Sequence, residues 1–140
     1  MFWDSSALLV LLVDQPGTKE VRRLPAAGRV VWWGTRIECL SAVQRLRREG
    51  RLTEKETLLL EEDLGRLLSQ TIEIQPREAV RVRAERLLRI HPLRAADAFQ
   101  LASAMAFFED KPAGERFVCL DQRLSLAARA EGFTVQPEIT

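Results

Sequence analysis

Short apolar segments alternate along this chain with longer segments whose apolar residues recur at helical spacing. Brief runs rich in β-branched or aromatic residues predict strands within residues 1–3, 29–34, 71–76, 116–121 and 133–137. Helical periodicity predicts helices within residues 5–13, 18–28, 35–50, 53–70, 77–90, 95–108 and 122–132. Because strands alternate with helices, the pattern favours an α/β sandwich built around a mostly parallel sheet.

Several helices carry signals of their ends and of their buried faces. Thr53 and Glu56 fit a capping box at the start of the helix 53–70. Gly50 is placed to end the helix before it. That earlier helix is expected to turn one apolar face inward, formed by Ile37, Leu40, Val43 and Leu46. The segment 95–108 is apolar on most sides and is therefore expected in the core.

Composition limits the size and environment of the protein. The chain has 140 residues, 46% of them apolar and 29% charged, which predicts one domain over residues 1–140 with a substantial core. The net charge of +1 gives no overall field that would draw the chain onto nucleic acid. The apolar run 7–13 is too short to cross a membrane and lacks the flanks of a signal peptide. Cys39 and Cys119 lie in apolar stretches, so we expect a soluble, cytoplasmic protein with reduced cysteines and no membrane contact.

Four carboxylates occupy positions that such a fold brings to one edge. Asp4 follows the first predicted strand and Asp121 ends the fourth. Glu38 lies in the first turn of one predicted helix, and Asp97 lies in the early turns of the most apolar helix. In open α/β sheets, sites form beyond the carboxyl ends of the strands, where the strand order reverses. The pattern therefore predicts that these acids meet there.

Helix capping offers another interpretation of three of the acids. Asp4 and Asp121 are suited to the N-cap position. Glu38 and Thr35 match a capping box. Capping does not require these side chains to meet, so this interpretation stays open.

Asp97 is harder to explain by local structure alone, although a position near a helix N-terminus also favours an acid. Its neighbours are mostly apolar, and Asp97, Gln100 and Ser103 form a polar stripe at helical spacing. Such a stripe in a buried helix is expected to face polar partners.

Four carboxylates in one site would repel one another unless a cation lay between them. Oxygen ligands suit Mg²⁺ or Mn²⁺, and the chain has a single histidine, His91. Divalent ions in such sites activate water and stabilise the leaving oxygen of a phosphodiester. The acids therefore favour metal-assisted phosphodiester hydrolysis. Ser5 and Ser6 could orient Asp4, or simply satisfy free amides at a helix start.

Four stretches, in this order and spacing, resemble the PIN-domain family and in particular the VapC-type ribonuclease toxins: "FWDSSALLVLL", "TRIECLSAV", "LRAADAFQLASA" and "FVCLDQRLSLAARAEGFTV". The resemblance runs through nearly the whole chain. It implies a three-layer α/β/α sandwich with a central sheet of about five strands. It also implies an endoribonuclease that depends on Mg²⁺, with Mn²⁺ as a substitute, and leaves a 5′-phosphate and a 3′-hydroxyl.

The resemblance also assigns roles to the acids. It makes Asp4 and Asp97 the main metal ligands, with Glu38 and Asp121 completing the catalytic set directly or through water.

Further positions follow from the resemblance, and two depart from it. Ser6 corresponds to a small hydroxyl residue that often follows the first acid. Cys119 stands where many relatives have Thr or Ser, and Gln100 stands where many have His. Since neither departure removes a carboxylate, we expect activity. Arg94 and Arg123 are candidates for holding the RNA backbone, or for pairing with the acids.

Toxins of this type usually act with a small antitoxin and commonly form homodimers, so both partners are expected beside the RNA substrate. The helices 53–70 and 77–90 could serve either contact or simply pack on the sheet. Other functions stay open: a housekeeping PIN-domain nuclease that processes RNA, and an inactive module that binds RNA or protein. A phosphatase with Asp4 as nucleophile would usually have a second acid two residues later, where this chain has Ser6.

Overall fold

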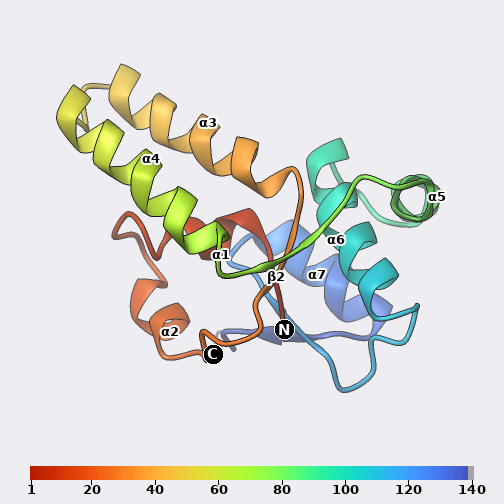
Figure 1. The fold of residues 1–140 in the computed structure, drawn as a ribbon. Coiled ribbons are helices and arrows are strands. Elements are labelled where there is room, and N and C mark those ends of the chain that lie inside the picture. Colours follow the sequence, from red (N-terminus) through yellow and green to blue (C-terminus); the bar gives the residue numbers. More distant parts are fainter. Residues whose placement is uncertain (139–140) are drawn as a thin grey trace.

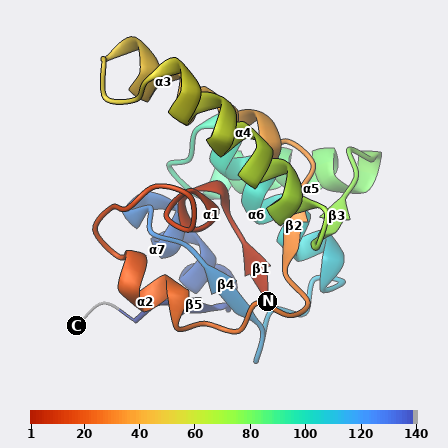
Figure 2. The same ribbon diagram turned by 60° about the vertical axis from the view of Figure 1, so that its left-hand side comes forward.

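The computed structural model describes residues 1–138. Five parallel strands form one sheet at its centre, in the order β3-β2-β1-β4-β5 (Figures 1 and 2). The strands are β1 (Phe2–Trp3), β2 (Val30–Trp32), β3 (Ile72–Ile74), β4 (Arg116–Val118) and β5 (Thr134–Gln136). All five lie in the segments for which the sequence predicts strands.

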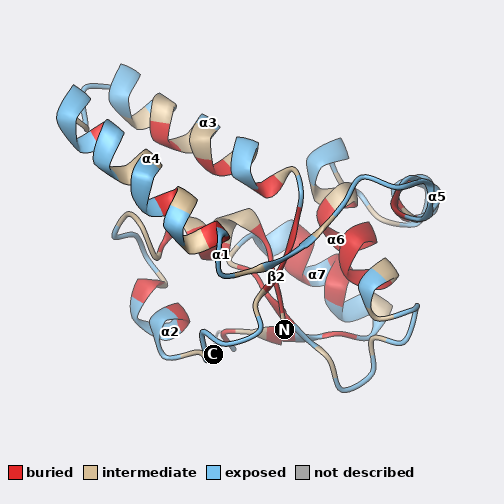
Figure 3. Ribbon diagram, viewed as in Figure 1, coloured by how far each residue is buried: buried red, intermediate tan, exposed pale blue. Residues whose placement is uncertain are grey.

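Helices cover both faces of this sheet. They are α1 (Ser5–Leu9), α2 (Thr18–Arg22), α3 (Thr35–Arg48), α4 (Glu54–Leu68), α5 (Glu78–Ile90), α6 (Ala95–Phe107) and α7 (Gln122–Glu131). Residues of α1 to α4 share one buried cluster with the sheet, and residues of α5 to α7 share the other. Figure 3 shows that the far end of the pair formed by α3 and α4 is mostly exposed, although Thr57 in the first turn of α4 is buried. The predicted three-layer α/β/α sandwich is confirmed.

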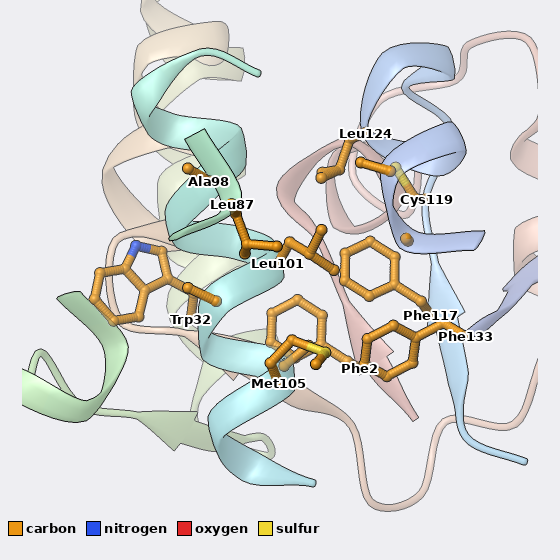
Figure 4. Close-up of a cluster of buried hydrophobic side chains, with 14 of the residues drawn as sticks. Phe2, Trp32, Leu87, Ala98, Leu101, Met105, Phe117, Cys119, Leu124 and Phe133 are labelled. Atoms are coloured by element: carbon orange, nitrogen blue, oxygen red, sulfur yellow. The ribbon is translucent and has the colours of Figure 1, made fainter. Parts of the chain in front are cut away.

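Successive side chains of the central strands point to opposite faces of the sheet and so contribute to both hydrophobic clusters. Phe2 belongs to the cluster beneath α5, α6 and α7, whereas Trp3 belongs to the cluster beneath α1, α3 and α4. Phe117 and Val118 of β4 divide in the same way, as expected for side chains that alternate across a pleated strand. The Phe2 and Phe117 rings stack with centroids 5.1 Å apart (Figure 4). Strands buried on both faces explain why these segments are apolar throughout.

The strand order reverses between β1 and β4. From β1 the chain proceeds outward to β2 and β3, and then returns to place β4 on the opposite side of β1. The backbone N–H of Asp4 donates to the carbonyl of Val118 across this junction, at 3.0 Å. After β1 the chain enters α1 on one face of the sheet, and after β4 it enters α7 on the other, which is the arrangement in which α/β sheets form their crevice.

Three local predictions need correction. The helix predicted over 5–13 ends at Leu9, because the next turns tighten into bonds from Leu11 to Leu8 and from Leu12 to Leu9. The helix within 18–28 ends at Arg22. Ile37 is not on the inner face of α3, since it is 64% exposed while the buried residues are Thr35, Cys39 and Val43.

Other local signals are confirmed. The capping box of Thr53 and Glu56 starts α4. Beyond the end of α3, Gly50 has a left-handed backbone with φ of 73°. The helix α6 is largely buried, as its apolar sequence predicted. Cys39 and Cys119 are buried free thiols. Across residues 1–138, no helix combines the length and apolar character that a membrane span requires.

Leu101 tests the packing of α6 on the sheet. It is fully buried, so Leu101→Ala should lower the free energy of unfolding by about 2–5 kcal/mol through lost contacts and a cavity. Leu88 of α5 is 46% exposed, and Leu88→Ala should change stability by less than about 1 kcal/mol. Urea denaturation of both variants measures the difference. Equal losses would contradict the described packing.

Candidate functional site

A cavity of about 1000 Å³ lies at the carboxyl edge of the sheet, and three of the four predicted acids line it. Glu38 comes from the first turn of α3, Asp97 from the first turn of α6, and Asp121 from the N-cap of α7. Ser5 at the start of α1 also lines the cavity. We call this cavity the acidic hollow. Three helix N-termini thus deliver carboxylates to one site, where the positive ends of the helix dipoles favour negative charge.

The fourth acid, Asp4, is not part of the cavity lining. It is only 3% exposed, directly after β1. Its Oδ1 atom accepts hydrogen bonds from the Ser6 hydroxyl at 2.7 Å and from the Ala7 N–H at 3.2 Å. Burial raises the pKa of Asp4 from 3.8 to about 7, although these hydrogen bonds oppose the rise.

Ser6 also joins the two central strands. While its hydroxyl donates to Asp4, the same oxygen accepts the N–H of Leu120 at 2.9 Å. Cys119 lies beside this bond, with its Sγ atom 4.0 Å from the Ser6 hydroxyl. Burial raises the pKa of the Cys119 thiol, which keeps its proton and donates to the carbonyl of Asp121 at 3.4 Å. Ser6 thus contacts the carboxylate of Asp4, whereas Cys119 contacts the backbone carbonyl of Asp121.

Glu38 is held by two hydrogen bonds from distant elements. Its Oε1 accepts from the Ser5 hydroxyl at 3.0 Å, and its Oε2 accepts from Nε2 of Gln100 at 2.9 Å. Burial raises the pKa of Glu38, and the charge of Asp97 adds to the rise. Ser5 therefore serves Glu38, a role that the sequence did not indicate.

The capping-box interpretation of Glu38 is wrong. Gly34 is the N-cap of α3, and no side chain caps that end. The Thr35 hydroxyl instead accepts from Nε2 of Gln100 at 2.9 Å. The polar stripe of α6 thus faces polar partners, as predicted, because Gln100 reaches both Thr35 and Glu38.

Asp97 and Asp121 combine local capping with a place in the acidic hollow. Asp97 is half-buried and accepts a long bond of 3.4 Å from the N–H of Arg94. Burial raises the pKa of Asp97, and the negative charge of Asp121 raises it further. Asp121 caps α7 through a 2.8 Å bond from the N–H of Leu124 to its Oδ1. The N-cap interpretation of Asp121 and Asp4 is therefore confirmed, and it does not exclude a role in the site.

Three arginines line the acidic hollow: Arg45, Arg94 and Arg123. Arg94 and Arg123 were predicted to lie there, and their positive charges partly offset the rise in the pKa of Asp97. Within residues 1–138, none of the four acids forms an ion pair.

Arg45 was missed because it belongs to a run of arginines typical of a solvated helix face. Glu38, Ser41 and Arg45 are spaced i, i+3 and i+7, which places them on one side of α3. This spacing is the signal that could have found Arg45.

The chemistry of the donors fits a hard divalent cation. The site supplies carboxylate oxygens without paired cations, and burial and mutual repulsion raise the pKa values of Glu38 and Asp97. As the side chains stand, however, no three Asp, Glu, His or Cys groups among residues 1–138 converge closely enough to hold one ion. Three of these groups could bind one ion together only after side-chain rearrangement, whereas Mg²⁺ commonly binds one or two carboxylates and completes its shell with water.

Solved structures show which known fold the chain shares. It matches FitAcB from Neisseria gonorrhoeae with a TM-score of 0.66 at 18% identity, over 96% of this chain and 94% of the other. It matches VapC20 from Mycobacterium tuberculosis, described as a toxin that cleaves the sarcin–ricin loop, with a TM-score of 0.64 at 16% identity, over 90% and 93%. A chain of a toxin–antitoxin complex from Klebsiella pneumoniae gives 0.62 at 15% identity, over 87% of each chain.

No protein-family model matches the chain, and a search of curated proteins found no significant match. The structural similarity therefore establishes the fold. The chain shares the α/β fold of these three solved structures, and this agrees with the fold that the resemblance to the PIN-domain family implied.

The buried carboxyl of Asp4 should make stability depend on pH. The folded state holds the Asp4 proton more tightly than the unfolded chain, so stability falls as the pH rises from about 4 to about 7. Asp4→Asn keeps an oxygen for Ser6 and Ala7 but has no charge to bury. In EDTA at pH 8, the free energy of unfolding of this variant should exceed that of the unmodified chain by about 2 kcal/mol.

The comparison is made by urea denaturation at pH 8 and pH 4, where the advantage should disappear. Asp14→Asn, at an 83% exposed side chain, is the matched control and should show no such pH dependence. A variant that is no more stable than the original chain at pH 8 would contradict the burial of a charged Asp4.

Proposed function

We propose that this protein is a metal-dependent endoribonuclease and the toxin of a VapBC-type toxin–antitoxin pair. The observation that carries this proposal is the gathering of Glu38, Asp97 and Asp121 around one hollow, with Asp4 buried directly after β1. None of the four is neutralised by an ion pair within residues 1–138. Clustered carboxylates without ion-pair partners attract cations from solution. In a purely structural cluster, Lys or Arg side chains of the protein would pair with these acids.

Asp4, Asp97 and Asp121, with Glu38, would hold Mg²⁺ or Mn²⁺. The bound ions would activate a water molecule and stabilise charge on the scissile phosphate. The hydrogen bonds of the structure prepare the carboxylates for this task. Ser6 fixes Oδ1 of Asp4, and the N–H of Leu124 fixes Oδ1 of Asp121, so each group keeps its Oδ2 for other ligands.

Arg45, Arg94 and Arg123 supply the positive charge that an RNA backbone requires. Each is exposed and lines the acidic hollow without an ion pair within residues 1–138. Guanidinium groups bind phosphate oxygens bidentately, so these three side chains can hold the strand on either side of the acids.

The similar structures favour a toxin over the alternatives. VapC20 is described as cleaving RNA, and another match belongs to a toxin–antitoxin complex. We therefore propose RNA as substrate, a small antitoxin and a second copy of this chain as partners, and action in the cytoplasm. Retention of all four acids disfavours an inactive module, and Ser6 already engages Asp4 where a phosphatase would place its second acid. A neighbouring gene for a small DNA-binding antitoxin would favour the toxin over a housekeeping nuclease.

Removal of one carboxylate or of the metal should abolish cleavage. Asp97→Asn should reduce RNA cleavage at least about 100-fold while the fold is retained, because the carboxylate would hold the ion. Treatment with EDTA should have the same effect on the unmodified protein, and Mn²⁺ or Mg²⁺ should restore activity. Asp63→Asn on α4, purified in the same way, is the control for contaminating nucleases. Cleavage that persists in EDTA would contradict the metal mechanism.

Arg45 should act on binding of RNA more than on chemistry. Arg45→Gln should raise KM for RNA by about 3- to 30-fold with a small change in kcat, since it removes one charge-assisted contact to phosphate. Arg47→Gln is the matched control, because that side chain lies on the same helix but does not line the acidic hollow. Steady-state cleavage of a labelled RNA distinguishes the two. Equal effects of both variants would indicate a general charge effect.

A further inference from the structure

A second cavity lies at the carboxyl ends of β2 and β3. Its volume is about 370 Å³. Three aromatic side chains, two arginines and one glutamate contribute to its walls, which consist of Trp32, Trp33, Pro76, Arg77, Glu78, Val80, Arg81 and Phe99. We call it the tryptophan cavity. No residue of this cavity has a role in the site described above.

One aromatic wall of this cavity is rigid. Trp32 is 7% exposed and stacks on Phe99, with centroids 5.4 Å apart and ring planes 7° from parallel. Figure 4 shows Trp32 set apart from the phenylalanines of the central core. The indole packs so closely over the following backbone that a Cβ at Gly34 would lie 2.5 Å from its Nε1 atom. Glycine at this position therefore permits the packing.

The other aromatic wall is open to solvent. Trp33 is 49% exposed, and its ring meets Trp32 edge-on with centroids 6.5 Å apart. Its backbone is nevertheless fixed, since its N–H donates to the carbonyl of Ile74 in β3 at 2.9 Å. A large aromatic side chain that is held on ordered backbone and half open to water offers a flat apolar face to a ligand.

The tryptophan cavity is connected to the acidic hollow through two helices. Trp33 lies two residues before α3, whose first turn carries Glu38. Phe99 is followed by Gln100, whose side chain binds Glu38 at 2.9 Å. Parallel β-strands end at the same edge of the sheet. An extended ligand can therefore follow that edge from one cavity to the other.

Charge favours a nucleic acid as the occupant. Arg81 is paired with Glu78, but Arg77 forms no ion pair within residues 1–138 and lies at the cavity wall. A flat aromatic ring beside an uncompensated guanidinium suits a base that stacks and a phosphate that follows it.

We propose that the tryptophan cavity binds an unpaired nucleobase of single-stranded RNA, stacked on Trp33, with Arg77 on the adjoining phosphate. The inference rests on the proposed function, because the acidic hollow would act on the same strand. It adds a subsite for a nucleotide that flanks the scissile bond. Stacking on an aromatic ring is tolerant of base identity, so this subsite strengthens binding more than it selects a sequence.

Binding is measured by fluorescence anisotropy with a labelled 12-nucleotide oligoadenylate and with an abasic deoxyribose-phosphate oligomer of equal length. The protein carries Asp97→Asn so that the RNA stays intact, and Mg²⁺ is present. Trp33→Leu should raise the Kd for oligoadenylate by about 5- to 100-fold. Trp33→Phe should recover most of the affinity, and neither change should affect the abasic oligomer. Leu88→Ala, at an exposed position on α5, is the matched control.

The outcomes separate this inference from the proposed function. If oligoadenylate binds and wild-type protein cleaves RNA, but Trp33→Leu binds as well as the parent, the subsite is wrong and the nuclease stands. A loss of self-association in Trp33→Leu, with RNA binding intact, would overturn the inference and make Trp33 a protein contact. An equal loss for the abasic oligomer would also overturn stacking. If the protein neither binds nor cleaves RNA, both proposals fall.

Discussion

The hydroxyl of Ser6 is the contact on which the site depends. It donates to the buried carboxyl of Asp4 and accepts the N–H of Leu120, so one oxygen joins the segments that leave the two central strands. Without this hydroxyl the carboxyl would lose its shortest hydrogen bond, and the Leu120 N–H would lose its partner. The burial of Asp4 is tolerated only because this bond and the Ala7 N–H partly offset the loss of solvation.

Capping and chemistry are combined in the same residues. Asp4 and Asp121 each begin a helix and also lie at or beneath the acidic hollow. Asp97 lies in a first turn, where the helix dipole stabilises a negative charge. Local structure thus offsets part of the repulsion among the acids. The remaining repulsion and desolvation, seen in the raised pKa values of Glu38 and Asp97, are the force that would attract a cation.

Sequence periodicity predicts the sandwich because strands buried on both faces must be short and apolar, and because the helices between them have one apolar side. Sites in open α/β sheets form beyond the carboxyl ends of the strands, and this rule predicts from the sequence alone that Asp4 and Asp121 lie at the same edge. Exposure of Ile37 and the contact of Ser5 with Glu38 could not be predicted in this way. Each depends on the angle at which α3 crosses the sheet, and that angle is set by packing between elements distant in sequence.

The position of Trp33 in the wall of a second cavity could not be predicted for a related reason. In the sequence, "RVVWWG" is typical of an ordinary buried strand, and only tertiary structure shows that the second tryptophan lies beyond it. Positions that depart from the expected burial in this way are where function is most often found.

The order of the strands has a consequence for synthesis of the protein. β4 and Asp121 come from the last quarter of the chain, yet β4 pairs with β1 at its start. A nascent chain that has not yet released these residues from the ribosome has no switch point and no acidic hollow. The topology therefore lets the acidic hollow form only after β4 and Asp121 have been synthesised and β4 has paired with β1.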